Sequence, residues 1–165
     1  QEIVIKKLFH VKEKAHARFD ATSRLYKYFI STKKDPFSRH FSWYCYTPFD
    51  IGAMNRAAKI LFDYEDFTSF AKLHGGAKTN ICKIMEAGWK ADANKLVFTI
   101  RSDRFLRNMV RSIVGTMTDV GRGKITSDDF RKVIESKNRN IAGKSAPAHG
   151  LFLEKITYDW DKIIP

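Results

Sequence analysis

The stretch Arg24-Leu-Tyr-Lys-Tyr-Phe-Ile-Ser31 alternates with a period of two and predicts a β-strand. Arg24, Tyr26, Tyr28 and Ile30 share one face of this strand. The residues between them share the opposite face, so the stretch is expected to form part of a sheet.

Other alternating stretches extend the sheet. Asn80 to Lys90 and Lys95 to Arg101 both alternate, and the turn-forming sequence Ala-Asp-Ala-Asn lies between them, which predicts an antiparallel hairpin. Residues 151–158 are a predicted final strand. Residues 1–9 also alternate like a strand and contain no methionine, so we expect a segment of a longer protein.

Three helices are predicted between these strands. Asp50 suits the N-cap of a helix running to about Tyr64. A second helix from about Phe105 to Val120 ends at a glycine stop, and a third, through about Ser136, opens with a capping box at Thr126. Residues expected to be buried on the first two helices are Ile51, Met54, Ala58, Leu61, Phe62, Leu106, Met109, Val110, Ile113, Val114 and Met117.

Strands and helices are interspersed along the 165 residues, and at least one strand pair is a hairpin. This order predicts a single α+β domain in which helices pack on one face of the sheet. Residues 33–50, which contain two prolines and several aromatics, are expected to form a long loop or short irregular strands.

The composition indicates a polyanionic partner. Thirty Lys and Arg against eighteen Asp and Glu give a net charge of +12, so RNA or DNA is the first partner to consider, although a domain can also be basic without binding either. Cys45 and Cys82 are far apart and show no metal-ligand spacing, which predicts neither zinc nor a disulfide framework and favours the cytoplasm. No apolar stretch is long enough for a membrane span.

Three arginines are candidate anion-binding residues. Arg104, Arg107 and Arg111 recur at helical spacing and are expected to lie on one narrow arc at the start of the second helix. Guanidinium groups suit bidentate contacts with phosphate or carboxylate. The alternative interpretation is a solvated basic edge paired with Asp103 or Asp119.

Aromatic residues supply a second candidate feature. Tyr26 and Arg24 share a strand face, and a ring beside a cation can stack a splayed base and hold its phosphate; ordinary packing within the sheet is the alternative. The aromatic residues of 40–46 could add a second stacking surface, with core packing as the preferred interpretation. Gly75-Gly76 is expected to lie in a flexible loop able to approach RNA.

Four blocks in order resemble one family, the TruA-type tRNA pseudouridine synthases. The first, residues 16–28, holds an Ala-Arg-Phe run leading to an Arg-x-Tyr-x-Tyr strand, and Asp66-Phe-Thr-Ser-Phe70 is the second. The third is Phe105-Leu-Arg-Asn-Met-Val-Arg-Ser-Ile-Val-Gly115, and the closing block is Ala146-Pro-Ala-His-Gly-Leu-Phe-Leu153. Together they span nearly the whole chain.

The resemblance implies a pseudouridine synthase fold, an antiparallel sheet flanked by helices, in a homodimer that binds the anticodon arm of tRNA. The implied reaction isomerises uridine to pseudouridine in the anticodon stem-loop and needs no cofactor and no metal. By the same resemblance, Tyr26 stacks on the target uracil with Arg24 nearby, and Arg111 lies beside the catalytic aspartate and keeps it ionised. Arg104 and Arg107 are then expected to contact the RNA.

The family's aspartate lies in an Arg-Thr-Asp-x-Gly-Val-His motif upstream of the first matching block. No aspartate of this chain stands in such a motif, and Asp66 in particular is expected to form a structural turn. Residues 1–165 are therefore expected to be a C-terminal domain that lacks the nucleophile and is inactive alone. Two alternatives remain open, a non-catalytic basic RNA-binding module and a structural or dimerisation domain.

Overall fold

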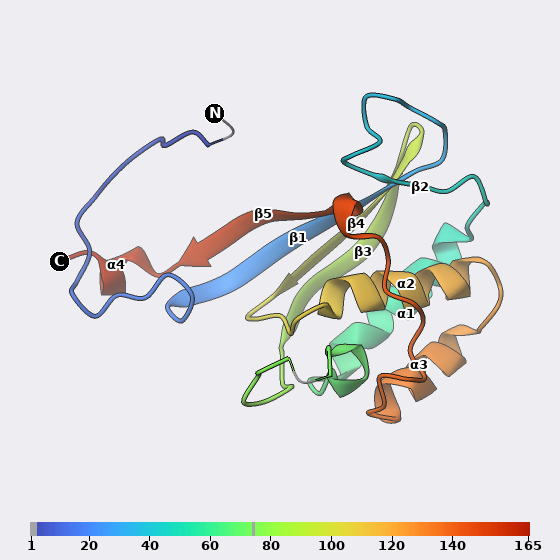
Figure 1. The fold of residues 1–165 in the computed structure, drawn as a ribbon. Helices are drawn as coiled ribbons and strands as arrows, with labels where there is room; N and C mark the ends of the chain where they lie inside the picture. The colour runs from blue at the N-terminus through green and yellow to red at the C-terminus, as the bar shows by residue number, and fades with distance from the viewer. Residues whose placement is uncertain (1–2, 74) are drawn as a thin grey trace.

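The predicted α+β fold is confirmed in a computed structural model, which describes residues 3–73 and 75–165. The strands are β1 (Ala21–Ser31), β2 (Trp43–Tyr44), β3 (Ile84–Asp92), β4 (Lys95–Ser102) and β5 (Leu151–Tyr158). The helices are α1 (Ile51–Ile60), α2 (Met109–Gly121), α3 (Ser127–Glu135) and the single turn α4 (Trp160–Ile163). Short 3₁₀ turns cover Leu61–Asp63, Thr68–Phe70 and Ala148–Gly150. Helices α1, α2 and α3 gather on one face of the sheet (Figure 1).

Strand β1 is the centre of the sheet. It pairs antiparallel with β4 on one side and with β5 on the other, and β4 pairs with β3. The short β2 joins the end of β1 in parallel. The predicted hairpin is confirmed, but its first strand begins at Ile84, because the backbone of Asn80 and Cys82 bonds instead to residues 65 and 67.

The core lies between the sheet and the helices. On β1, Tyr28 and Ile30 face the helices and are opposite Phe98 and Leu96 of β4. Phe70 and Phe130 stack with ring centroids 5.8 Å apart. Full burial of each such side chain contributes about 1.5–3 kcal/mol. The alternation that predicted β1 therefore identifies the face that packs against the helices.

The helix ends show which local signals were correct. Asp50 accepts a hydrogen bond from the Ala53 N–H (2.8 Å), and Thr126 and Asp129 form a reciprocal capping box. Gly123 takes the left-handed conformation (φ 69°) just after α2, which confirms the glycine stop. Phe62 is 48% exposed, contrary to expectation, because the 3₁₀ turn after α1 rotates it off the apolar stripe.

The predicted start of α2 is wrong by one turn. The helix begins at Met109 rather than Phe105, because Asn108 takes the left-handed conformation (φ 69°) and interrupts helical geometry before that point. Arg104 and Arg107 therefore precede the helix, and only Arg111 lies in it. The expected single arc of three arginines does not form.

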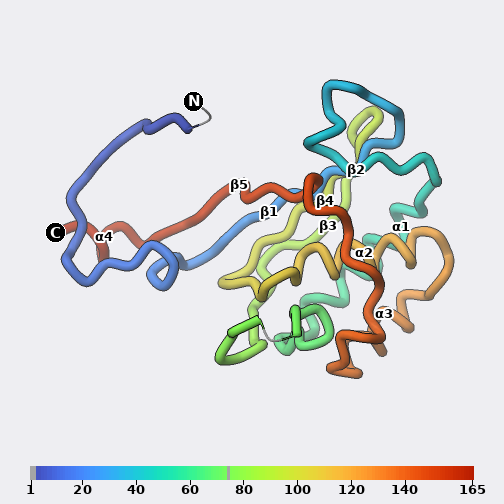
Figure 2. The backbone as a smooth tube through the Cα atoms, viewed as in Figure 1, coloured from blue at the N-terminus to red at the C-terminus, as the bar shows by residue number. Residues whose placement is uncertain are grey.

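The N-terminal segment is not a strand. Residues 3–9 are exposed and run away from the sheet (Figure 2), with no strand partner in the described part of the chain. Residues 1–2, also part of the predicted strand, lie outside the described residues. Alternation alone cannot form a strand where no neighbour supplies backbone partners. Within 3–73 and 75–165, no helix has the length and apolarity to cross a membrane.

The segment before β5 lies directly against the backbone of α2. A Cβ atom built at Gly115 would clash severely with the carbonyl oxygen of Lys144 and would lie 3.2 Å from the Ala146 nitrogen. A Cβ at Gly143 would lie 3.0 Å from the Thr116 Cα. Two glycines on facing segments thus allow an approach that other residues would block.

Replacing Gly115 by alanine is expected to destabilise the domain. Overpacking costs about 1–3 kcal/mol, more than the roughly 1 kcal/mol that alanine gains over glycine in a helix. Urea unfolding of Gly115→Ala should show this net loss. Gly88→Ala is the matched control, since its Cβ would meet only the Asn55 Oδ1 at 3.7 Å. Equal stability of the two variants would contradict the close packing.

Candidate anion-binding site

Arg111 is held by two hydrogen bonds to one residue of the closing block. Its Nε donates to the carbonyl oxygen of Ala146 (2.7 Å), and the Ala146 N–H donates to the carbonyl oxygen of Arg111 (2.9 Å). Neither Nη atom donates to an acceptor among the described residues. The guanidinium is therefore fixed through Nε while its two Nη groups can bind a carboxylate or a phosphate.

Arg111 lines a groove of about 850 Å³. Among the described residues, four further cations line it and no carboxylate does. None of the five takes part in an ion pair within residues 3–73 and 75–165, although eight other lysines and arginines there do. Unpaired cations in a concave surface produce a local field that attracts anions. The five cations are Lys72, Arg107, Arg111, Arg139 and Lys144.

A hydrogen-bond network orders one wall of this groove. The Asn108 side chain donates to the Ser145 hydroxyl oxygen (2.6 Å), and Arg139 donates to the same oxygen (3.0 Å). Arg139 also donates to the carbonyl oxygens of Ala142 and Gly143. Lys72, Arg139 and Lys144 were not among the anion-binding residues predicted from the sequence, and the last two lie in the loop before β5. The sequence signal that could have indicated the last two is that Arg139 and Lys144 flank Ala142-Gly143, whose small residues allow close contact with α2.

The three predicted arginines do not share one site. Arg107 and Arg111 line the groove, whereas Arg104 lies near Cys82. Burial raises the pKa of the Cys82 thiol to about 11, despite the opposing charge of Arg104, so the thiol is protonated at neutral pH. The alternative pairing with Asp103 or Asp119 is not found: Asp119 binds Lys124, and the Asp103 carboxylate accepts bonds from backbone N–H groups and Ser102.

Tyr26 and Arg24 lie close together on β1. The Tyr26 ring is half-buried and packs edge-to-face on Phe105, with centroids 5.2 Å apart. Burial raises the pKa of the Tyr26 hydroxyl, and the Arg24 charge opposes this. The Arg24 guanidinium donates to the carbonyl oxygens of Ala21 (2.9 Å), Asp103 (2.6 Å) and Arg18. Arg24 is thus held by backbone, and the substrate contacts of both residues stay predictions.

Tyr28, two residues beyond Tyr26, connects β1 to the closing block. Its hydroxyl donates to the carbonyl oxygen of Pro147 (2.8 Å), and a Cβ at Gly150 would lie 2.8 Å from its ring. Burial raises the pKa of the Tyr28 hydroxyl, and the nearby Arg111 charge opposes this. Residues 146–150 therefore contact both the central strand and Arg111.

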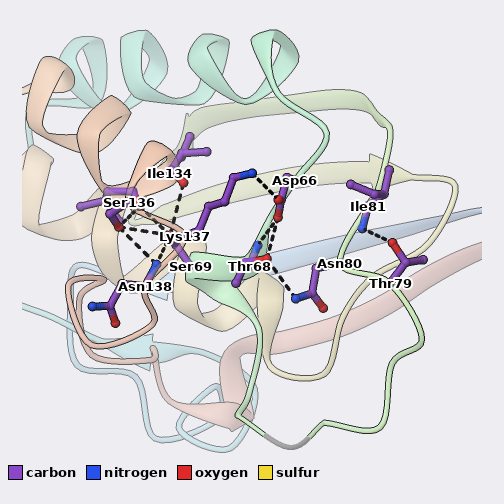
Figure 3. A network of polar contacts seen from close by, with 11 residues as sticks. Asp66, Thr68, Ser69, Thr79, Asn80, Ile81, Ile134, Ser136, Lys137 and Asn138 are labelled. Atoms are coloured by element: carbon purple, nitrogen blue, oxygen red, sulfur yellow. Dashed lines mark hydrogen bonds and ion pairs between the residues drawn. The ribbon is translucent and has the colours of Figure 1, made fainter.

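The structural turn expected at Asp66 is confirmed (Figure 3). Its Oδ1 accepts hydrogen bonds from the Thr68 N–H (3.0 Å) and hydroxyl (2.6 Å), and its Oδ2 pairs with Lys137 (3.0 Å). In the same network, the Ser69 hydroxyl donates to the carbonyl oxygen of Val133 near the end of α3. The Asp-Phe-Thr-Ser-Phe element thus joins α3 to the rest of the core.

Fold and site together define a basic α+β domain with a groove suited to a polyanion. The chain belongs to the tRNA pseudouridine synthase family, whose model matches residues 57–159. This confirms the family resemblance of the four blocks. Among the described residues, no cluster of His, Cys, Asp or Glu is arranged to hold a metal ion.

Individual relatives are similar over nearly the whole chain. The tRNA pseudouridine synthase A of Parabacteroides distasonis is 56% identical over 158 residues, and that of Bacteroides fragilis is 57% identical over 159 residues. Both alignments cover 96% of this chain but 63% of the relative. The tRNA pseudouridine synthase A of Bacillus subtilis is 38% identical over 160 residues, which cover 96% of this chain and 65% of the relative. The chain thus spans a little under two thirds of these relatives.

Asp66→Asn should reduce stability in a pH-dependent way. Although partial burial opposes the shift, hydrogen bonds from Thr68 and Lys137 lower the pKa of the Asp66 carboxyl. A carboxyl group whose pKa is lowered by folding stabilises the folded state fully at pH values above its unfolded-state pKa of about 3.9. This stabilisation is lost as the pH falls through the folded-state pKa. Near pH 7, urea unfolding should show a loss of about 0.5–1.5 kcal/mol.

The difference from the wild-type chain should shrink below about pH 4. Asp161→Asn, at an exposed position of α4, is the control and should change stability by less than about 0.5 kcal/mol. A loss for Asp66→Asn that is the same at acid and neutral pH would rule out the charged network as its cause.

Proposed function

We propose that this chain is part of an enzyme that isomerises uridine to pseudouridine in tRNA. The observation that carries the proposal is the fixed Arg111, with free Nη groups, in a cationic groove of a chain belonging to the tRNA pseudouridine synthase family. From the family resemblance, we further propose that the target uridines lie in the anticodon stem-loop. We also propose that the enzyme is a cytoplasmic homodimer and needs no cofactor. The tRNA substrate is supported by the similarity to tRNA pseudouridine synthase A of two organisms.

The proposed chemistry rearranges one nucleotide. The bond between N1 of uracil and C1′ of ribose breaks, the base turns, and C5 bonds to C1′; C5 loses its proton and N1 gains one. The base must leave the stack to enter the pocket, where we propose that the Tyr26 ring supports it. An aspartate outside these 165 residues acts as nucleophile or base, and the Arg111 Nη groups keep it ionised.

The remaining groove cations would hold the RNA backbone. These four have no carboxylate partner within residues 3–73 and 75–165, and such side chains bind phosphates independently of sequence. Arg104 and Arg24 are retained as proposed RNA contacts at the edge of the site. The Arg24 guanidinium already donates to backbone carbonyl oxygens, and neither arginine lines the groove, so we expect smaller contributions from them.

A non-catalytic RNA-binding module is the second candidate function. It is favoured by one observation, that five cations and no carboxylate line the groove in the part of the chain that the structure describes. The same groove serves both functions, so only a chemical assay separates them.

Groove binding should appear in the salt dependence of tRNA affinity. Each phosphate-binding cation contributes about one unit to the slope of log affinity against log salt concentration. Arg107→Ala and Lys144→Ala should each reduce the slope by about one unit, measured by fluorescence anisotropy. Lys59→Ala, at an exposed position of α1 away from the groove lining, should leave it unchanged. Similar slopes for all three would contradict the groove as the RNA site.

Tritium release from tRNA labelled at C5 of uridine tests the chemistry. We expect release by a protein extended to the length of its relatives, and none by residues 1–165 alone. In the extended protein, Tyr26→Ala should slow release about 5- to 150-fold, because base stacking contributes about 1–3 kcal/mol. Tyr26→Phe keeps the ring and should retain most activity.

Asp66→Asn serves as the control in the extended protein. It should keep near-normal release, because Asp66 belongs to a structural turn. Tight tRNA binding by the extended protein without tritium release would favour the non-catalytic module instead.

A further inference from the structure

The loop between β1 and α1 exposes several aromatic rings. Phe37 is 91% exposed, Phe41 59% and Tyr46 80%. The preferred expectation of core packing for residues 40–46 is therefore wrong at Phe41 and Tyr46. Cys45 is buried between the exposed Tyr44 and Tyr46 in sequence, as expected where side chains alternate next to a sheet.

Hydrogen bonds hold this loop in one arrangement. The Asp35 carboxylate accepts from the Phe37 N–H (3.0 Å), and the Asp35 carbonyl accepts from the Ser38 N–H (3.3 Å). The Phe41 N–H and the Ser42 hydroxyl both donate to the Ser38 carbonyl oxygen, at 2.9 and 3.0 Å. The exposed rings thus belong to a pre-ordered surface, which reduces the entropy lost when a ligand binds.

The same loop borders a second cationic cavity. It has a volume of about 370 Å³, and Lys33, Lys34, Arg39, Tyr44 and His149 line it. The three loop cations take part in no ion pair within the described ranges. The carboxylate in the lining, Asp35, is bound to the loop's own backbone. A ring beside unpaired cations suits a nucleotide, with its base on the ring and its phosphate on the cations.

This cavity and the Arg111 groove are joined by one short segment. Lys144 and Ser145 line the groove, and His149 lines the cavity. Ala146, whose carbonyl oxygen binds Arg111, is three residues before His149, so at most about 11 Å of extended backbone separates them. Figure 1 shows this segment rising from α3 towards the loop beside β2. One nucleic-acid strand can therefore contact both sites.

We propose that residues 33–46 form a second RNA subsite, in which the Tyr44 ring stacks on an unpaired base and Lys33, Lys34 and Arg39 bind the adjoining phosphates. The inference rests on the proposed function, because it concerns the same RNA that Arg111 contacts. Phe37, beside the cavity-lining Pro36, supplies a second ring. Charge favours RNA as the occupant over a second copy of this chain, which carries a net charge of +12 itself.

Affinity for unmodified tRNA tests the subsite in the protein extended to the length of its relatives. Tyr44→Ala and Phe37→Ala should each weaken binding about 5- to 100-fold in fluorescence anisotropy. Tyr44→Phe, which keeps the ring, should bind within about twofold of the wild type. The matched control is Phe62→Ala, at a 48% exposed ring distant in sequence from the loop, which should bind normally. Lys33→Ala with Lys34→Ala should reduce the salt slope by about two units.

Three results would separate the possibilities. Tyr44→Ala binding as tightly as Phe62→Ala would overturn the subsite. So would a shift of the loop variants from dimer to monomer in sedimentation without a change in affinity, since the rings would then bind a second copy. Tritium release, measured on the same samples, tests the proposed function separately. If the wild-type protein releases no tritium but its tRNA binding still depends on Tyr44, the RNA subsite is supported and the proposed enzymatic activity is contradicted.

Discussion

The reciprocal hydrogen bonds between Arg111 and Ala146 are the constraint on which the rest of the site depends. They require the segment before β5 to lie against the backbone of α2, which glycine at 115 allows. The same segment continues to Pro147, whose carbonyl oxygen accepts a hydrogen bond from the Tyr28 hydroxyl on the central strand. It then reaches Gly150, which lies against the Tyr28 ring. The segment thus connects the helix that carries Arg111 to the central strand, and its Ala146 carbonyl oxygen holds the guanidinium through Nε.

The charged side chains described around Arg111 are all positive. Eight lysines and arginines elsewhere on the domain pair with carboxylates, as Arg131 does with Asp63. Those around Arg111 have no such partner in the described part of the chain. A groove of unpaired cations is costly to maintain without a ligand, since like charges repel. The arrangement is therefore better explained by an anionic ligand than by stability, and the family makes tRNA the proposed ligand.

Local signals in the sequence predicted most of the fold. The alternation of Arg24 to Ser31 identified the central strand, and the caps at Asp50 and Thr126 identified two helix starts. The start of α2 could not be predicted, because Asn108 takes a left-handed conformation that residue spacing does not reveal. Two of the five groove cations described, Arg107 and Arg111, were predicted. Lys72 was not, and Arg139 and Lys144 reach the groove through a loop whose path depends on contacts with α2.

A structure of the extended protein bound to tRNA would test the central claim most directly, through the surroundings of the Arg111 guanidinium. The account predicts that the Nε–Ala146 bond persists and that a carboxylate from outside these 165 residues lies within about 4 Å of the Nη atoms. The target uracil should lie against Tyr26. An Arg111 turned away from Ala146, or bound to a phosphate with no carboxylate nearby, would contradict the account.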